Sequence, residues 1–257
     1  MSSKMLRAFA GFLGKKKSSR PFKDFYGEWF KALKNEHLPH LRRAMASSTV
    51  SPVILAAQVE ALHRHLLAYY EALDEAAADD VAQVLFPEWR NWLEKPFLWL
   101  GDLHPYLFTN LLRSFLDSDE EGESSTVGQP WYLATAWRSP PKTLMSRVDQ
   151  IQCGLRLMVP ALAARLRHAQ AAFVERVGRE WCEGGIIEEC VAAQLEEVVG
   201  VVVDANRLRR SVVSDILNVT DVYQAALFLE SLGQFLVGLR DEKWLAQLEK
   251  CKMPMNG

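Results

Sequence analysis

Histidines are the first residues to weigh for chemistry, because a group of them can hold a metal ion or haem. His63 and His65 lie two residues apart, which separates them by about 200° on a helix and prevents them from sharing one metal. His37 and His40 flank Pro39 without a cysteine or acidic cluster at the spacing of a metal site. We therefore expect no metal and no cofactor, with a haem or small-ligand sensor left as an alternative.

Sequence motifs of catalysis give no support to an enzyme. The chain has no Gly-x-Ser-x-Gly motif, no cysteine in a recognisable catalytic setting and no glycine loop ending in Lys-Ser or Lys-Thr. Its acidic pairs, such as Glu188 with Glu189, have the spacing of a solvated helix surface. A triad could still assemble from distant positions, but we predict no catalytic residues and no enzymatic activity.

The start of the chain is strongly basic, because the first acidic residue is Asp24. We predict that residues 1–21 form a basic, partly apolar, flexible arm. Each Lys or Arg near an anionic lipid surface adds about 1 kcal/mol to binding, and aromatic side chains can enter the interface. A solubilising or transit-like tail is the alternative. The residues expected to contact a membrane or an acidic partner are Lys4, Arg7, Phe9, Phe12, Leu13, Lys15, Lys16, Lys17 and Arg20.

Two further segments are candidates for interactions with other proteins. Trp89, Trp92 and Trp99 are candidates because tryptophan is enriched at binding hot spots, although helical spacing favours a place in the core. Of the three, Trp92 is the best exposed candidate. The acidic, serine-rich segment 117–130 is predicted to be a flexible loop, either a plain linker or a site of phosphorylation.

Helices must position these side chains, since apolar residues recur at steps of three and four. The first pattern begins at Phe22, and we expect Pro39 to bend or end it. The second follows Pro52 and continues through Ala82. The third, from Trp89 to Leu100, predicts a helix that is kinked or broken at Pro96.

The second half of the chain repeats the helical pattern. After a helix near residues 106–115, the next pattern spans 151–177, has Phe173 on its apolar side and a kink expected at Pro160, and precedes a break at Gly184 and Gly185. Another places Leu195 and Val202 on one seam, and the last begins with Thr220 as its cap. No segment is a convincing strand. We predict an all-α bundle of about seven helices, some kinked at proline.

Composition agrees with one helical domain in a reducing compartment. The chain has 257 residues, 49% of them hydrophobic, which is enough for a full core. A net charge of -2 argues against a surface that grips nucleic acid throughout. Four scattered cysteines do not form a disulfide framework, and no apolar run is long enough to span a membrane. The expected organisation is the arm, a domain over 22–249 and a tail over 250–257.

The centre of the chain resembles the plant delay-of-germination domain, which also forms the C-terminal part of the TGA transcription factors. Looser similarity extends the match from Phe22 to Trp244. The resemblance rests on His65, Tyr69, Tyr70, the run Ala76 to Val81, Trp89, Glu94, Phe97, Leu98, Trp99 and Gly101.

The departures from the family pattern indicate which subgroup of the family the chain resembles. Leu73 stands where the family usually has lysine, and Gly101 to Tyr106 replaces Gly-Gly-Trp-Arg-Pro-Ser. Only about twenty residues precede the domain, without a basic region and zipper, so we expect no direct sequence-specific DNA binding. One family member is associated with haem through late histidines, whereas the last histidine here is His168.

Among stand-alone members, the chain is most similar to the inaperturate pollen proteins. That resemblance implies a non-enzymatic adaptor that marks plasma-membrane domains for pollen aperture formation. It also implies protein partners, such as a receptor-like kinase or a sister adaptor, and a cytoplasmic location with peripheral membrane association. A nuclear regulator of transcription or hormone signalling is the alternative that other family members suggest.

Overall fold

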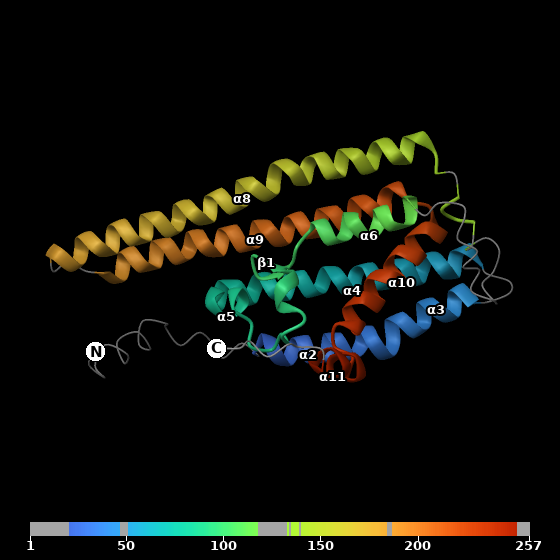
Figure 1. The fold of residues 1–257 in the computed structure, drawn as a ribbon, viewed down its shortest axis with the longest axis horizontal. Coiled ribbons are helices and arrows are strands. Elements are labelled where there is room, and N and C mark those ends of the chain that lie inside the picture. The colour runs from blue at the N-terminus through green and yellow to red at the C-terminus, as the bar shows by residue number, and fades with distance from the viewer. Residues whose placement is uncertain are drawn as a thin grey trace.

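The computed structural model describes residues 21–46, 51–117, 133, 135–138, 140–183 and 187–250, without the side chains of 180–183 and 187–190. Helices dominate this part of the chain, and the prediction of an all-α bundle is confirmed (Figure 1). The division into arm, domain and tail stays a prediction.

The first helical rod passes through Pro39 instead of ending there. It consists of α2 (Phe22–Ala32), a π-helical segment η1 (Leu33–His37) and α3 (Leu38–Ala46). The backbone N–H of Leu38 bonds to the carbonyl of Leu33, five residues earlier, which is the hydrogen bond of a π-helix. Pro39 directly follows this π-helical turn, so its missing N–H falls where the regular α-helical hydrogen bonding of the rod is already interrupted.

The second helix is shorter than its sequence pattern predicts. Helix α4 (Pro52–Asp79) ends at Asp80, and a separate short helix α5 (Val81–Leu85) follows. The Asp80 side chain accepts hydrogen bonds from the backbone N–H groups of Ala82 and Gln83, at 3.0 and 3.4 Å. Asp80 thus caps a new helix, and the prediction of one helix through Ala82 is wrong.

The predicted helix over Trp89 to Leu100 is also wrong. This segment contains a short 3-10 helix, η2 (Lys95–Phe97), and two strands, β1 (Leu98–Trp99) and β2 (Asp102–Leu103), that pair antiparallel. Leu100 and Gly101 turn the chain between them with φ angles of 46° and 91°. Positive φ at both central residues is typical of a tight hairpin turn, so the expectation of no strand fails at these two short elements.

The second half of the chain builds a long helical hairpin. After α6 (Tyr106–Leu116) come α8 (Lys142–Glu183) and α9 (Ile187–Val219), which lie side by side (Figure 1). Helix α8 continues through Pro160 without a break in the helix. The break expected at Gly184 and Gly185 lies outside the described residues.

The C-terminal helices are α10 (Val222–Gly238) and α11 (Glu242–Lys250), the second of which the sequence patterns did not separate. Asp221, not Thr220, caps α10. Its carboxylate accepts from the N–H groups of Tyr223 and Gln224, and the Gln224 side chain accepts from the N–H of Asp221. The Thr220 hydroxyl instead donates to the carbonyl of Ile216, in the last turn of α9.

Helix α4 lies at the centre of the body and packs against α2, α3, α9 and α10. Its fully buried side chains, such as Leu55, Leu62 and Leu73, join Leu33 and Phe228 in one hydrophobic core. In the described residues, no single helix is both long and apolar enough to cross a bilayer. The pair α10 and α11 reaches the required hydropathy only together, across a bend of 58°.

Candidate functional site

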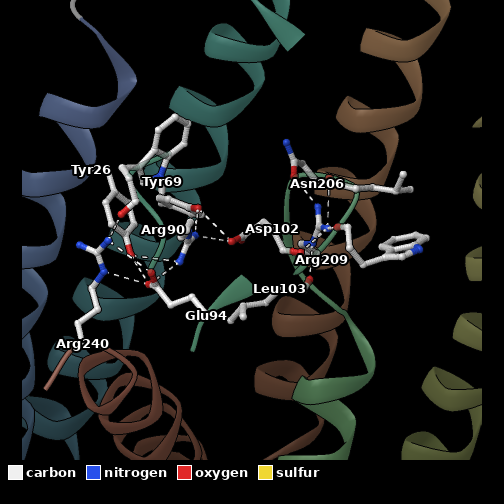
Figure 2. A network of polar contacts seen from close by, with 12 residues as sticks. Tyr26, Tyr69, Arg90, Glu94, Asp102, Leu103, Asn206, Arg209 and Arg240 are labelled. Atoms are coloured by element: carbon white, nitrogen blue, oxygen red, sulfur yellow. Dashed lines mark hydrogen bonds and ion pairs between the residues drawn. The ribbon is translucent and has the colours of Figure 1, made fainter. Parts of the chain in front are cut away.

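Six polar side chains from distant parts of the sequence meet inside the body (Figure 2). We call them the Arg90 cluster. The segment after α5 supplies Arg90 and Glu94, and strand β2 supplies Asp102. The members are Tyr26, Tyr69, Arg90, Glu94, Asp102 and Arg240.

Arg90 is the centre of this cluster. Its guanidinium donates to Glu94 at 3.1 Å, to Asp102 at 2.6 Å and to the hydroxyl of Tyr69 at 2.7 Å. Arg240 donates to the same Glu94 carboxylate at 3.0 Å. Arg90, Glu94 and Asp102 are each at most 5% exposed, and the partly exposed Arg240 supplies the second positive charge that balances the two carboxylates.

The energetic role of the cluster follows from this burial. Removing one partner of a buried ion pair typically costs about 3–5 kcal/mol, because the other charge is left uncompensated. The bonds of Tyr26 and Arg240 to Glu94 span 68 and 146 residues of sequence. The Arg90 cluster therefore fastens the irregular segment after α5 to α2 and to the end of α10.

The cluster is poorly suited to acid-base catalysis. Burial raises the pKa of Tyr26 to about 12, with Arg90 opposing the shift, and burial also raises the pKa of Tyr69 well above its usual value. Both phenols therefore stay protonated at neutral pH. They donate to Glu94 at 3.3 Å and to Asp102 at 3.1 Å, so their protons are already engaged within the cluster.

A cavity of about 20 Å³ lies beside the cluster, lined in part by Tyr69, Tyr70 and Asp102. The Nε–H group of Arg90, which also lines it, is buried without a hydrogen-bond partner. The volume suits one water molecule, whereas small-molecule sites usually measure about 300 Å³ or more. This cavity is too small for haem and gives the ligand-sensor alternative no support.

A second buried arginine holds the β-hairpin. Arg209 of α9 donates to the carbonyls of Leu103 at 2.7 Å and Asp102 at 3.1 Å, and also to the carbonyl of Trp99 (Figure 2). Asn206 accepts from the same guanidinium at 2.7 Å. Backbone carbonyls thus satisfy a fully buried cation, and the hairpin is fixed against α9.

The three tryptophans occupy different environments. Trp89 packs against Phe22 with ring centroids 5.3 Å apart, and Trp99 is half-buried, with Arg209 5.6 Å from its ring centroid. Trp92 is 38% exposed, as its sequence position indicated. Whether any of the three binds a protein stays a prediction.

The structure separates most of the histidines. His63 lies 3.1 Å from the hydroxyl of Ser214 on α9, whereas the ring of His65 stacks on Trp29 of α2. The Nε2 of His65 lies 3.0 Å from the Trp29 carbonyl, and the Trp29 indole donates to the His65 carbonyl at 2.8 Å. His37 packs on His65 with centroids 4.2 Å apart.

These histidines do not assemble a metal site. Among the described residues, no group of three or more His, Cys, Asp or Glu side chains could hold a metal ion. Burial, and then the charge of His37, lowers the pKa of His65 to about 4. His65 is thus a neutral side chain that joins α2 to α4.

Two predicted sites cannot be placed. The residues of the basic arm that were predicted to contact a membrane or an acidic partner, Lys4 to Arg20, lie outside the described residues. The acidic loop does so as well, apart from Asp117 at the end of α6.

Sequence patterns missed a surface at the far end of the helical hairpin. We call residues 165–183 of α8 and 187–200 of α9 the distal hairpin, which extends beyond α5 (Figure 1). Phe173 and Leu195, both expected on buried seams, are 37% and 44% exposed, and Val174 is 70% exposed. The apolar side of α9 is covered at Val202, which is fully buried. Toward the start of α9, this apolar side extends beyond the helices that cover it.

The two helices of the distal hairpin differ in charge. Over residues 165–183, α8 carries four arginines and three glutamates. Between Ile187 and Asn206, α9 carries four glutamates, one aspartate and no Lys or Arg. An acidic helix thus lies beside one that carries both signs of charge, and Arg165 joins them through Glu197 at 3.0 Å. Exposed apolar side chains between charged ones are typical of a binding surface.

Comparison with known proteins identifies relatives along almost the whole chain. A family model described as "DOG1: Seed dormancy control" matches residues 37–114. The protein INAPERTURATE POLLEN1 of Arabidopsis thaliana is 44% identical over 95% of this chain and 98% of its own length. Its homolog from Oryza sativa subsp. japonica is 36% identical over 91% of this chain and 90% of its own length. Transcription factor TGA4 of A. thaliana is 24% identical over 86% of this chain but only 56% of its own length.

Proposed function

This chain belongs to the inaperturate pollen family, and from that premise we propose that it is a non-enzymatic scaffold for pollen aperture formation. The observation that carries the proposal is the 44% identity to INAPERTURATE POLLEN1 over 95% of this chain. Similarity of that extent includes the body, the Arg90 cluster and the hairpin, not only the segment 37–114 that the family model matches.

The geometry favours binding over catalysis. The Arg90 cluster is buried and its charges are balanced, so it supports the fold and is closed to a substrate. Exposed apolar side chains lie instead on outer surfaces, among them Phe86, Trp92, Trp244 and those of the distal hairpin. A rigid helical body that presents such surfaces is suited to holding partner proteins.

We further propose that the scaffold acts at plasma-membrane domains. The basic segment with Lys15, Lys16 and Lys17 supports this, because clustered lysines are attracted to the anionic cytoplasmic leaflet. Phe9 and Phe12 add apolar contact, and together they provide reversible peripheral binding. A receptor-like kinase or a sister adaptor is the kind of partner that the scaffold holds there.

Imaging in developing pollen tests this function. The full chain with a fluorescent tag is expected to gather at discrete plasma-membrane domains before apertures form. A variant with Lys15, Lys16 and Lys17 changed to Gln is expected to spread through the cytoplasm, whereas a triple change of exposed body lysines Lys23, Lys31 and Lys34 to Gln is the matched control. Equal membrane signal in both variants would contradict the role of the arm.

The similarity to transcription factor TGA4 supports one alternative, a nuclear regulator. The same experiment separates the two functions, because a nuclear regulator requires the tagged chain to accumulate in nuclei. Signal confined to nuclei in developing pollen would reject the membrane scaffold.

A further inference from the structure

The side of α9 that packs on the body at Val202 continues uncovered beyond α5. The position that a Cβ on Gly101 would take lies 2.7 Å from the side chain of Val84 on α5 and 3.7 Å from that of Val202, so the two valines are at one level. Leu195 lies on the same side of α9, seven residues or about 10 Å nearer its start. Leu195 is 44% exposed, and Phe86, directly after α5, is 79% exposed. Apolar side chains of both elements are thus open to a further segment of chain.

The elements that carry these apolar side chains are acidic. From Glu71 to Glu88, the end of α4, the whole of α5 and the turn after it carry six acidic residues and no Lys or Arg. Asp74 pairs with Arg210 of α9 at 3.0 Å, which places this end of α4 beside α9. The acidic stretch of α9 therefore has a second acidic stretch next to it.

We call six exposed side chains of these two stretches the α5–α9 surface. The members are Glu75, Phe86, Glu88, Ala192, Leu195 and Glu196. None of the three glutamates forms an ion pair with another described residue. A segment that covers this surface must therefore offer both apolar side chains and positive charge.

We infer that the basic arm of the same chain docks on the α5–α9 surface. Before Phe22 the chain carries six Lys or Arg and no acidic residue, so its charge is opposite to that of the surface. Met5, Phe9 and Phe12 recur at steps of four and three, which places them on one side of a helix if this segment becomes helical on docking. The arm thus offers both of the properties that the surface requires.

The arm also joins the body beside this surface. It continues into α2 at Phe22, whose ring centroid lies 5.3 Å from that of Trp89, the residue after Glu88. The start of α2 lies at the same end of the body as α5, and the distal hairpin extends beyond that end (Figure 1). Twenty residues reach about 65 Å when extended, more than the roughly 63 Å length of α8, so the arm is long enough to reach α9.

This contact regulates the membrane binding that we propose for the arm, and the regulation rests on that proposed function. Lys15, Phe9 and Phe12 cannot contact the α5–α9 surface and a lipid surface at the same time. Because the arm is tethered, its effective concentration at the α5–α9 surface is about 1 mM. A contact with a dissociation constant of about 0.1 mM then keeps about nine tenths of the arms docked until anionic lipid competes for them.

Cross-linking with a carbodiimide tests the docked arm without lipid, because this reagent joins a lysine to a carboxylate only where the two are in contact. In the full-length chain, Lys15–Lys17 are expected to join the three glutamates of the α5–α9 surface within one molecule, and about 0.5 M salt is expected to prevent this. Mass spectrometry identifies the joined residues. Cross-links spread evenly over the exposed carboxylates of the body would overturn the inference.

Vesicles of phosphatidylcholine and phosphatidylserine, at about 3:1, test the competition with lipid. Leu195→Ser combined with Glu196→Gln weakens the docked state and is expected to raise the affinity of the full-length chain for these vesicles by about three- to tenfold. Val53→Ser combined with Glu36→Gln is the matched control, since both residues are exposed and lie outside the α5–α9 surface. It is expected to leave the affinity unchanged. Equal affinities of the two double variants would overturn the inference.

The two measurements separate this inference from the proposed function. Cross-links at the α5–α9 surface in a chain that does not bind vesicles would retain the docked arm and reject its membrane role. Vesicle binding that the change at Leu195 and Glu196 leaves unaltered would reject the docked arm and retain the membrane role.

Discussion

The Arg90 cluster and the distal hairpin both bring arginines close to carboxylates, but they do so in opposite environments. Around Arg90 the charges are removed from water and each has a partner, so the fold depends on every one of them. On the distal hairpin, Arg167, Arg176 and Glu196 are exposed, and none of them forms an ion pair with another described side chain. The comparison teaches that the same residue pairing matters greatly for stability when it is buried and little when it is exposed.

The largest expected loss of stability comes from removing Arg90, the centre of the buried cluster. Arg90→Ala leaves Glu94 and Asp102 buried without a cation, and we expect it to lower the free energy of unfolding by about 3–5 kcal/mol. Arg64→Ala is the control, because Arg64 also pairs with a glutamate four residues away, at 3.2 Å, but on the surface. It should cost about 0.5 kcal/mol or less in urea titrations. Equal costs for the two variants would refute the structural role of the cluster.

A matched pair of phenylalanine variants compares the hydrophobic packing of the two regions. Phe228→Ala removes a fully buried ring from the body and should cost about 3–5 kcal/mol. Phe173→Ala removes a partly exposed ring from the distal hairpin and should cost about 1 kcal/mol in the monomer. Thermal and urea unfolding would measure both, and a larger cost for Phe173 would show that its ring is packed more tightly than its exposure indicates.

The pH dependence of stability tests the contact between His65 and Trp29. Because the pKa of His65 falls to about 4 in the folded chain, the unfolded chain binds a proton first as the pH drops. Stability is therefore lost between about pH 6.5 and 4, by about 1 kcal/mol after allowing for partial exposure. His65→Gln should reduce that loss, whereas His168→Gln, at an exposed histidine of the distal hairpin, should leave it unchanged.

The smallest expected effect on stability is that of Val174→Ser. The side chain is 70% exposed, so the free energy of unfolding of the monomer should change by no more than about 0.5 kcal/mol. A loss of more than about 2 kcal/mol would show that Val174 packs within its own chain.

The helical seams of the body could be predicted from sequence because their periodicity is local. The steps that bury Leu55, Leu62 and Leu73 of α4 appear directly in the sequence, and burial bears them out. Helix ends were less predictable where two capping residues compete. Thr220 and Asp221 are adjacent and both can cap a helix, and only the capping box that Asp221 forms with Gln224 shows which of them begins α10.

The Arg90 cluster could not be predicted in the same way. Arg90 and Glu94 are four residues apart, a spacing that usually marks an exposed ion pair on a helix. Their burial depends on Tyr26, Asp102 and Arg240, which come from other elements. Likewise, the apolar periodicity around Leu195 is the same whether or not another helix packs on it. Only the structure shows that the helices covering α9 stop at the end of α5, which leaves Leu195 exposed.

The length of α8 sets a fixed spacing within the molecule. With 42 residues, this helix separates its two ends by about 63 Å, and α9 lies along it and stiffens it. Molecules bound at opposite ends would be kept apart by roughly the width of two small domains. The chain can thus act as a spacer, setting how closely neighbouring components crowd together.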